Sequence, residues 1–207
     1  MTFAEYIFLK KFRKENSHIK LLGSEILENI ANKNESVIFV SGHFANFELM
    51  SMEITKSKVK LATVYRPLNN FFLNPFMEFL RKKYICKNQI KKGRAGVKQS
   101  IEYIKKGHSV ALMIDQRVSE GEKVKFFNID ALTTTLPAQL ALKYNLKIVP
   151  VFIERRNTNF FEMKVHEPID VSKFNSKLEI SQKLNKVLEN MIIKNPHQWI
   201  WTHNRWK

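Results

Sequence analysis

The chain has 207 residues and a formal net charge of +16, from 35 lysines and arginines against 19 acidic residues. Its hydrophobic content of 44% supports a packed core and excludes an intrinsically disordered chain. The single cysteine, Cys86, excludes an internal disulfide and a cysteine-rich zinc site. This length predicts one domain over residues 1–207.

The sequence contains no segment long enough to cross a bilayer. Its longest uncharged stretches, residues 36–47 and 131–142, have 12 residues each, whereas a membrane helix needs about 20. At the N-terminus the apolar residues come before the basic ones, which is the reverse of a secretory signal peptide. We therefore expect the chain on the cytoplasmic side of any membrane that it meets.

The first half of the chain alternates short apolar runs with amphipathic segments. Residues 37–41 (VIFVS) predict a buried strand that Gly42 ends, and residues 45–55 predict a helix. Residues 60–65 (KLATVY) predict a second strand, stopped by Pro67, and residues 71–83 an aromatic-rich helix. Apolar spacing predicts a further helix at residues 94–106, and residues 109–115 (SVALMID) a third buried strand.

The second half continues the alternation. We expect a short strand at residues 123–127, a short helix at residues 136–144, and a strand pair at residues 148–154 and 160–167 with a turn at residues 156–159. The clearest helix spans residues 178–194, behind a capping-box pattern at Ser176 and Glu179. Alternating strands and helices predict a single-domain α/β fold with a mostly parallel central sheet flanked by helices.

Basic residues are concentrated between residues 81 and 106, which hold ten lysines or arginines and one acidic residue, Glu102. Such a surface attracts nucleic acid, anionic lipid or an acidic protein, or is simply solvated. Four phenylalanines lie beside the start of this stretch: Phe71, Phe72, Phe76 and Phe79. They suit an element at a membrane interface or a core helix equally well.

Polar residues follow three of the predicted strands, at the sheet edge where α/β proteins bind ligands. His43 follows the first strand and suits a general base. Glu48 lies five residues on and could orient His43, provided that His43 precedes the helix, because five helical steps of about 100° would separate the two side chains. A capping histidine with a solvated glutamate is the alternative.

Arg66 and Asp115 follow the second and third strands. Pro67 restricts the backbone of Arg66, and a guanidinium at such a position suits phosphate or carboxylate recognition, although a plain surface arginine fits as well. Asp115 is either functional or an ordinary loop residue. The sequence has no serine nucleophile elbow, phosphate-binding glycine loop or histidine spacing typical of metal ligands, so no metal is expected.

Six sequence blocks, in order, resemble the bacterial late acyltransferases of lipid A biosynthesis, the lauroyl and myristoyl acyltransferases of the lysophospholipid acyltransferase group. The blocks are SGHFANFELM at residues 41–50, VYRPLNN at 64–70 with Arg81 after it, ALMIDQR at 111–117, VKFFNIDALTTTLPAQLAL at 124–142, IVPVFIERR at 148–156 and PHQWIWTHNRWK at 196–207. Asn128 stands where this family usually has glycine. Family members usually carry a hydrophobic N-terminal helix that anchors them to the membrane; we expect this sequence to lack it, either as a short member or as a fragment of a longer protein.

The resemblance implies a glycerolipid-acyltransferase-like fold and acyl transfer from an acyl thioester to a hydroxyl of a lipid A precursor or similar glycolipid. It implies His43 as the base and Glu48 as its orienting partner. It also implies substrate binding by five residues: Asn46, Arg66, Arg81, Asp115 and Gln116. For Asp115 a structural role is the alternative. The expected donor is acyl carrier protein or coenzyme A, without a cofactor or a metal.

The resemblance also implies an anionic lipid acceptor and a peripheral position on the cytoplasmic face of the bacterial inner membrane. Because no spanning segment accompanies the charge of +16, we expect largely electrostatic binding to this surface. A lysophospholipid, an ornithine lipid or another glycolipid are alternative acceptors, and an inactive lipid-binding relative is an alternative to an enzyme. A nucleic-acid-binding protein is disfavoured, because no nucleic-acid-binding motif accompanies the charge.

Overall fold

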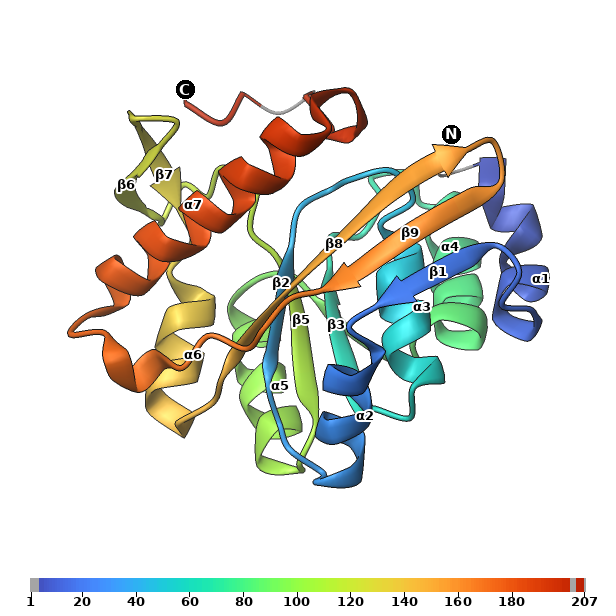
Figure 1. Ribbon diagram of the computed structural model, residues 1–207, viewed down its shortest axis with the longest axis horizontal. Helices are drawn as coiled ribbons and strands as arrows, with labels where there is room; N and C mark the ends of the chain where they lie inside the picture. The colour runs from blue at the N-terminus through green and yellow to red at the C-terminus, as the bar shows by residue number, and fades with distance from the viewer. Residues whose placement is uncertain (1–3, 202–203, 207) are drawn as a thin grey trace.

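Figure 1 shows the computed structural model of the chain, in which the structure describes residues 4–201 and 204–206. Thr202, His203 and Lys207 of the matched C-terminal block lie outside the described residues. Within them, a seven-stranded sheet has the order β1-β9-β8-β2-β5-β3-β4. Its strands are β1 Ile19–Leu22, β2 Ile38–Ser41, β3 Leu61–Tyr65, β4 Asn88–Lys91, β5 Ser109–Met113, β8 Ile148–Asn157 and β9 Phe160–Val165. A separate hairpin contains β6 Glu122–Phe126 and β7 Ile129–Thr133.

Five adjacent strands of the sheet run parallel: β8, β2, β5, β3 and β4. β9 runs antiparallel to β8, and β1 runs parallel to β9, so the sheet changes direction only once. β2 lies at the centre and is buried along its whole length, as expected for a strand covered on both faces. The prediction of a mostly parallel α/β sheet is confirmed.

Helices cover both faces of the sheet (Figure 1). The crossovers through α3 and α4 advance across the sheet in one direction and those through α5 and α6 return, so right-handed connections place the two pairs on opposite faces. The α-helices are α1 Leu9–Lys14, α2 Ser24–Asn32, α3 Glu48–Lys56, α4 Leu73–Leu80, α5 Arg94–Lys105, α6 Leu136–Tyr144 and α7 Lys177–Lys194. The short helical turns are η1 Ala4–Phe8, η2 Arg81–Ile85, η3 Val171–Lys173 and η4 Pro196–Gln198. No helix among the described residues combines the length and apolarity needed to span a bilayer.

The start of helix α7 is fixed by residues close to it in the sequence. The Ser176 side chain accepts a hydrogen bond from the Glu179 N–H at 3.2 Å, as the capping-box pattern predicts. The Glu179 carboxylate in turn accepts from the N–H of Asn175, one residue earlier than a standard capping box requires. The buried stripe of α7, which includes Ile180, Leu184 and Leu188, joins the common core.

Several short elements differ from the sequence-based expectation. α1, β1, α2, β4 and β7 have no predicted counterpart. The edge strand β4 carries only one buried residue and no apolar alternation that could have indicated it. The helix expected at residues 71–83 ends at Leu80 and continues as the wider turn η2. The helix expected from residue 45 begins at Glu48, because Ala45 adopts a left-handed backbone conformation with φ 44°.

The N-terminal turn of α5 packs unusually close to β4. A Cβ atom on Gly96 would lie 2.1 Å from the carbonyl oxygen of Lys91. Alanine favours helix by about 1 kcal/mol over glycine, but this backbone clash has no flexible partner that could move away. We expect Gly96→Ala to lower the free energy of unfolding by about 1–3 kcal/mol, measured by urea denaturation.

The exposed residue Gln99 on the same helix provides the control for Gly96. Gln99→Ala should change the free energy of unfolding by less than about 0.5 kcal/mol. Equal unfolding midpoints for the two variants would mean that α5 and β4 do not approach each other this closely.

Candidate active site

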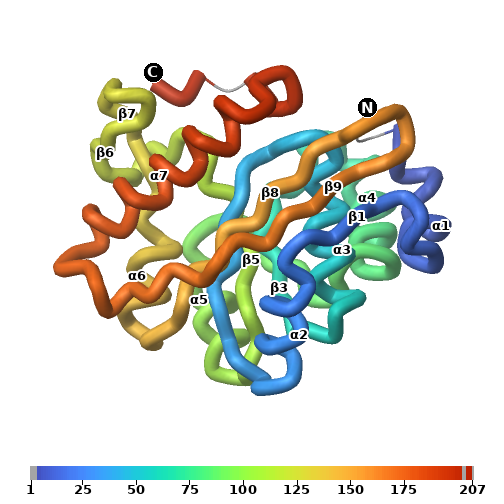
Figure 2. Tube along the Cα trace, in the orientation of Figure 1, coloured from blue at the N-terminus to red at the C-terminus, as the bar shows by residue number. Residues whose placement is uncertain are grey.

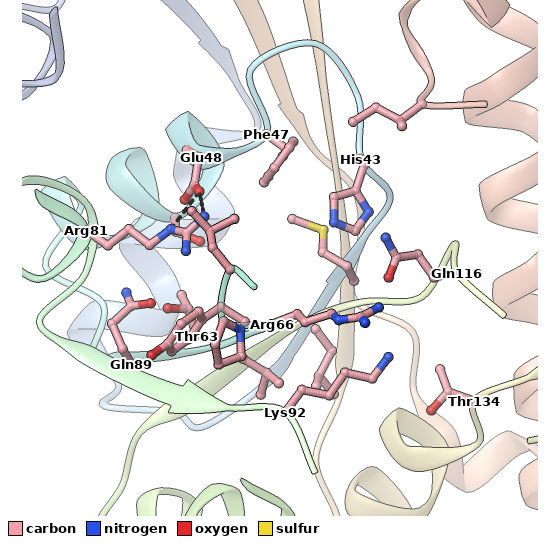
Figure 3. Close-up of a pocket in the computed structure, with 18 of the residues that line it drawn as sticks. His43, Phe47, Glu48, Thr63, Arg66, Arg81, Gln89, Lys92, Gln116 and Thr134 are labelled. Carbon is pink, nitrogen blue, oxygen red and sulfur yellow. Dashed lines mark hydrogen bonds and ion pairs between the residues drawn. The ribbon is translucent and has the colours of Figure 1, made fainter. Parts of the chain in front are cut away.

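A pocket of about 600 Å³ opens at the carboxyl ends of the parallel strands. Each of four strands contributes a residue from just beyond its end: His43 after β2, Arg66 after β3, Lys92 after β4 and Gln116 after β5. In Figure 3 the cationic ends of Arg66 and Lys92 point toward the side of the cavity where His43 and Gln116 lie. The parallel sheet thus gathers in one place residues that are far apart in the sequence.

His43 is bound to Asp115 through the pairing of two adjacent strands. In the register of β2 and β5, Ser41 lies beside Met113, so the residues two positions further along each chain arrive at the same level. His43 Nδ1 lies 2.8 Å from Asp115 Oδ1, and the His43 backbone N–H donates to Oδ2 at 2.8 Å. Asp115 therefore holds both the backbone and the ring of His43.

The Asp115 carboxylate is buried, with 3% of the residue exposed, and all its recorded partners are donors. Trp199 Nε1 donates to Oδ2 at 3.0 Å. Burial opposes ionisation, but the hydrogen bonds and charge of His43, together with the bond from Trp199, hold the pKa of Asp115 below its usual value. An ionised Asp115 accepts the Nδ1 proton of His43, which leaves Nε2 as the proton acceptor of the neutral ring.

The loop that carries His43 is fixed by the C-terminal segment. Ala45 N–H donates to the carbonyl of Gln198 at 2.9 Å, and Ile200 N–H donates to the carbonyl of His43 at 3.0 Å. Gly42 allows the close approach of this loop, since a Cβ atom there would lie 2.9 Å from the Phe44 ring and 3.2 Å from Asp115 Cβ. The backbone of His43 and of the loop after it is thus held in place by the C-terminal segment.

Glu48 is not the partner of His43, which corrects the sequence-based expectation. Its Oε1 atom accepts from Arg81 Nη2 at 2.6 Å and Nε at 2.9 Å and from the Tyr6 hydroxyl at 2.5 Å. Figure 3 draws the dashed bonds from Glu48 to Arg81, with Phe47 between Glu48 and His43 in this view. His43 does precede α3, as that expectation required, but the pairing of β2 with β5 places Asp115 against its ring. Glu48 points instead to Arg81 and Tyr6.

The Glu48–Arg81 ion pair forms one wall of the pocket and is buried. Burial alone would lower the pKa of Arg81, but the charges and hydrogen bonds of Glu48 and Tyr6 together outweigh it and raise the pKa. Burial and the neighbouring Glu48 charge also raise the pKa of Tyr6, so that its hydroxyl stays protonated as a donor. Arg81 Nη1 is buried and has no hydrogen-bond partner among the described residues.

Two other predicted substrate-binding residues are occupied within the protein. Asn46 is 1% exposed, lies outside the residues that line the pocket, and donates from Nδ2 to Glu5 at 2.8 Å. Asp115 supports His43 instead of facing the cavity. Both side chains point into the protein interior, so neither faces the cavity in this structure.

The pocket also contains residues that sequence reasoning missed. Three of them, Tyr6, Gln89 and Lys92, line the pocket. A fourth, Trp199, donates a hydrogen bond to Asp115. For Lys92 the available signal was its place in the basic stretch, but β4 was not predicted, so nothing placed Lys92 at a strand end. Apolar residues complete the walls, among them Phe47, Leu112, Met113, Val118, Leu136 and Ile200.

Removing one charge of the Glu48–Arg81 pair should destabilise the fold. Glu48→Gln would leave the Arg81 guanidinium buried without a counter-charge, and we expect a loss of about 3–5 kcal/mol in the free energy of unfolding. The double variant Glu48→Gln with Arg81→Met removes both charges and should recover part of that loss, measured by urea denaturation. A Glu48→Gln variant as stable as the unmodified chain would show that the pair contributes little.

Comparisons with known proteins find relatives of this chain. Residues 1–207 match the family model of bacterial lipid A biosynthesis acyltransferases. The chain is 24% identical over 184 residues to lipid A biosynthesis acyltransferase 2 of Shigella flexneri, covering 86% of this chain and 58% of that protein. It is 25% identical over 194 residues to lipid A biosynthesis lauroyltransferase of Escherichia coli strain K12, covering 91% of this chain and 61% of that protein.

The chain spans about three fifths of the length of these relatives. Among solved structures, it is similar to the 1-acyl-sn-glycerophosphate acyltransferase PlsC of Thermotoga maritima, with a TM-score of 0.54 and 19% identity, covering 96% of this chain and 81% of that one. This likeness shows the shared fold. Because the family model matches the whole chain, the chain belongs to the bacterial lipid A biosynthesis acyltransferase family.

Proposed function

We propose that the chain transfers a fatty acyl group from an acyl thioester to a hydroxyl of a lipid A precursor or similar glycolipid. The observation that carries this proposal is the histidine held by a buried carboxylate at the mouth of a pocket that also presents two cationic side chains. Family membership supports the same class of reaction. The donor is acyl carrier protein or coenzyme A, both of which present the thioester on a phosphopantetheine arm.

His43 supplies the base for this reaction. Its Nε2 atom takes the proton of the acceptor hydroxyl while the hydroxyl oxygen attacks the thioester carbonyl carbon. The carbon–oxygen bond forms, the carbon–sulfur bond breaks, and the departing sulfur receives the proton from the imidazolium. Asp115 keeps the proton on Nδ1 and stabilises the positive ring between the two transfers.

Arg66 and Lys92 supply the recognition of phosphate. Both line the pocket and both are exposed. A guanidinium binds phosphate through two parallel hydrogen bonds, whereas an ammonium group acts as a point charge. The lipid acceptor and the phosphopantetheine donor both carry phosphate, and the apolar wall at Leu112, Met113 and Leu136 suits the start of an acyl chain.

We further propose that the reaction takes place on the cytoplasmic face of the inner membrane, with the chain bound peripherally to an anionic surface. The direct test of the reaction incubates the chain with acyl-carrier-protein or acyl-coenzyme A thioesters and a lipid A precursor, followed by mass spectrometry of the lipid. One added acyl mass on the acceptor supports the proposal. Release of free fatty acid without a modified lipid would identify a thioesterase instead.

Substitutions of His43 and of Asp115 should each lower activity in protein that is still folded. His43→Ala removes the base and should lower kcat by at least about 100-fold. Asp115→Asn removes the charge that fixes the tautomer and should lower kcat by roughly 100- to 10,000-fold. Both are measured as initial rates of acyl transfer on protein shown to be folded by circular dichroism.

Asp130 provides the matched control for Asp115, since it lies on the exposed hairpin and pairs only with Lys125 among the described residues. Asp130→Asn should keep the rate of the unmodified chain. Near-normal turnover in folded His43→Ala would remove His43 from the mechanism.

We expect substitutions of Arg66 to weaken substrate use, more strongly with alanine than with lysine. Arg66→Ala should lower kcat/KM by roughly 10- to 150-fold, which corresponds to about 1.5–3 kcal/mol for a hydrogen bond to a charged group. Arg66→Lys keeps the charge but loses the paired donors, so its loss should be intermediate. Arg94→Ala, at an exposed arginine outside the pocket lining, is the control. An unchanged kcat/KM in Arg66→Ala would establish a plain surface role.

A further inference from the structure

Helix α4 presents a phenylalanine face to solvent. Phe72, Phe76 and Phe79 are spaced i, i+4 and i+7, which places them on one stripe, and they are 89%, 56% and 55% exposed. Phe71, just before the helix, is 83% exposed. On the opposite side of the helix Met77 is 4% exposed and packs into the core. The interpretation of these aromatics as a core helix is therefore wrong, because α4 packs against the core through Met77 and Leu80 and not through its phenylalanines.

Four phenylalanines this exposed, within nine consecutive residues, form a continuous patch from Phe71 to Phe79. Single exposed apolar residues are normal on protein surfaces, but contiguous ones mark a surface that binds something. Figures 1 and 2 show α4 on the opposite side of the molecule from α7, whose apolar stripe is buried. The apolar side chains of α4 named here face solvent, whereas those of α7 face the core.

The charges beside this face identify its partner. Lys82, Lys83 and Lys87 follow α4, are exposed, and form no ion pair with a carboxylate of the described residues. The Lys83 ammonium lies 5.2 Å from the centre of the Phe79 ring, so charge and aromatic surface are continuous. Glu78 is the one acidic residue between residues 71 and 92, and its carboxylate binds Asn74, Tyr65 and Lys91.

The phenylalanine face begins at the rim of the pocket. Leu68 and Asn69 line the pocket, and Phe71 follows two residues later. The intervening loop is fixed, because the Asn70 side chain accepts hydrogen bonds from the N–H groups of Phe72 and Leu73, at 3.0 and 2.9 Å. Asn74 in α4 accepts the N–H of Leu68 at 2.8 Å. A partner bound to α4 therefore lies next to the pocket entrance.

We propose that α4 and its leading loop insert into the interface of a lipid bilayer that contains anionic lipids. The four phenylalanines enter the boundary between headgroups and acyl chains, and Lys82, Lys83 and Lys87 contact lipid phosphates. A bilayer fits this surface because it is apolar beneath an anionic layer, the same order that α4 and its lysines present. This orientation brings the pocket entrance to the membrane, and it is measurable without turnover, so it stands or falls independently of the proposed reaction.

The first experiment measures binding to vesicles by co-sedimentation. Vesicles of phosphatidylcholine with roughly 30% phosphatidylglycerol supply the anionic surface. We expect Phe72→Ser with Phe76→Ser to weaken binding at least tenfold, and Lys82→Glu with Lys83→Glu to weaken it at least tenfold. Both should retain the unfolding midpoint of the unmodified chain, since all four side chains are exposed.

The matched controls lie on elements away from α4. Ile129→Ser with Ile193→Ser removes two exposed apolar side chains, and Lys173→Glu with Lys183→Glu makes the same change in net charge. Both controls should bind vesicles within about twofold of the unmodified chain. Equal weakening by the charge control would show that net charge alone attracts the chain and would overturn the role of α4.

The second experiment locates the inserted side chains. An environment-sensitive fluorophore is attached to Phe76→Cys, and to Ile129→Cys as control; Cys86 is 3% exposed, so labelling occurs at the introduced thiol. On vesicles, the emission from position 76 should rise and shift to the blue while that from position 129 stays constant. Unchanged emission from position 76 on bound vesicles would overturn the proposal. A shift that follows protein concentration without vesicles would assign the face to a second copy of the chain.

Discussion

The buried carboxylate of Asp115 is the interaction on which the candidate site depends. It accepts hydrogen bonds from the ring and backbone of His43 and from the indole of Trp199, so three segments of the chain meet on one side chain. Without this carboxylate, three buried donors would have no acceptor, and burying a donor without a partner costs free energy. The position of His43, and through Trp199 that of the C-terminal segment, therefore follows from a single ionised group.

The site contains a second buried carboxylate with a different task. Glu48 lies against a guanidinium and a phenol, whereas Asp115 lies against an imidazole and an indole. Arg81 carries a permanent charge, so its pair with Glu48 has no proton to exchange near neutral pH and fixes the wall of the pocket. An imidazole ring can accept and release a proton, so the pair of His43 with Asp115 can support proton transfer.

One segment of the chain connects the pocket with the phenylalanine face of α4. Arg66 at the end of β3 leads through the loop of Leu68 and Asn69 directly into α4, so the side of the pocket proposed to bind phosphate and the phenylalanine face belong to one continuous segment. The buried Arg81 continues that segment into the wall of the pocket. An acceptor that remains in a bilayer would reach His43 without leaving the lipid if α4 lies on that bilayer.

The sequence by itself determined which residues follow the three parallel strands β2, β3 and β5, because the cores of these strands are continuous apolar runs whose limits are local. His43, Arg66, Asp115 and the family resemblance all follow from such local patterns. Only the tertiary structure decided that His43 binds Asp115, 72 residues away, and not Glu48, because this depends on β2 lying beside β5. The same holds for the phenylalanines of α4: spacing shows that they share one face, but whether that face meets core or solvent depends on how Met77 packs the helix against the rest of the protein.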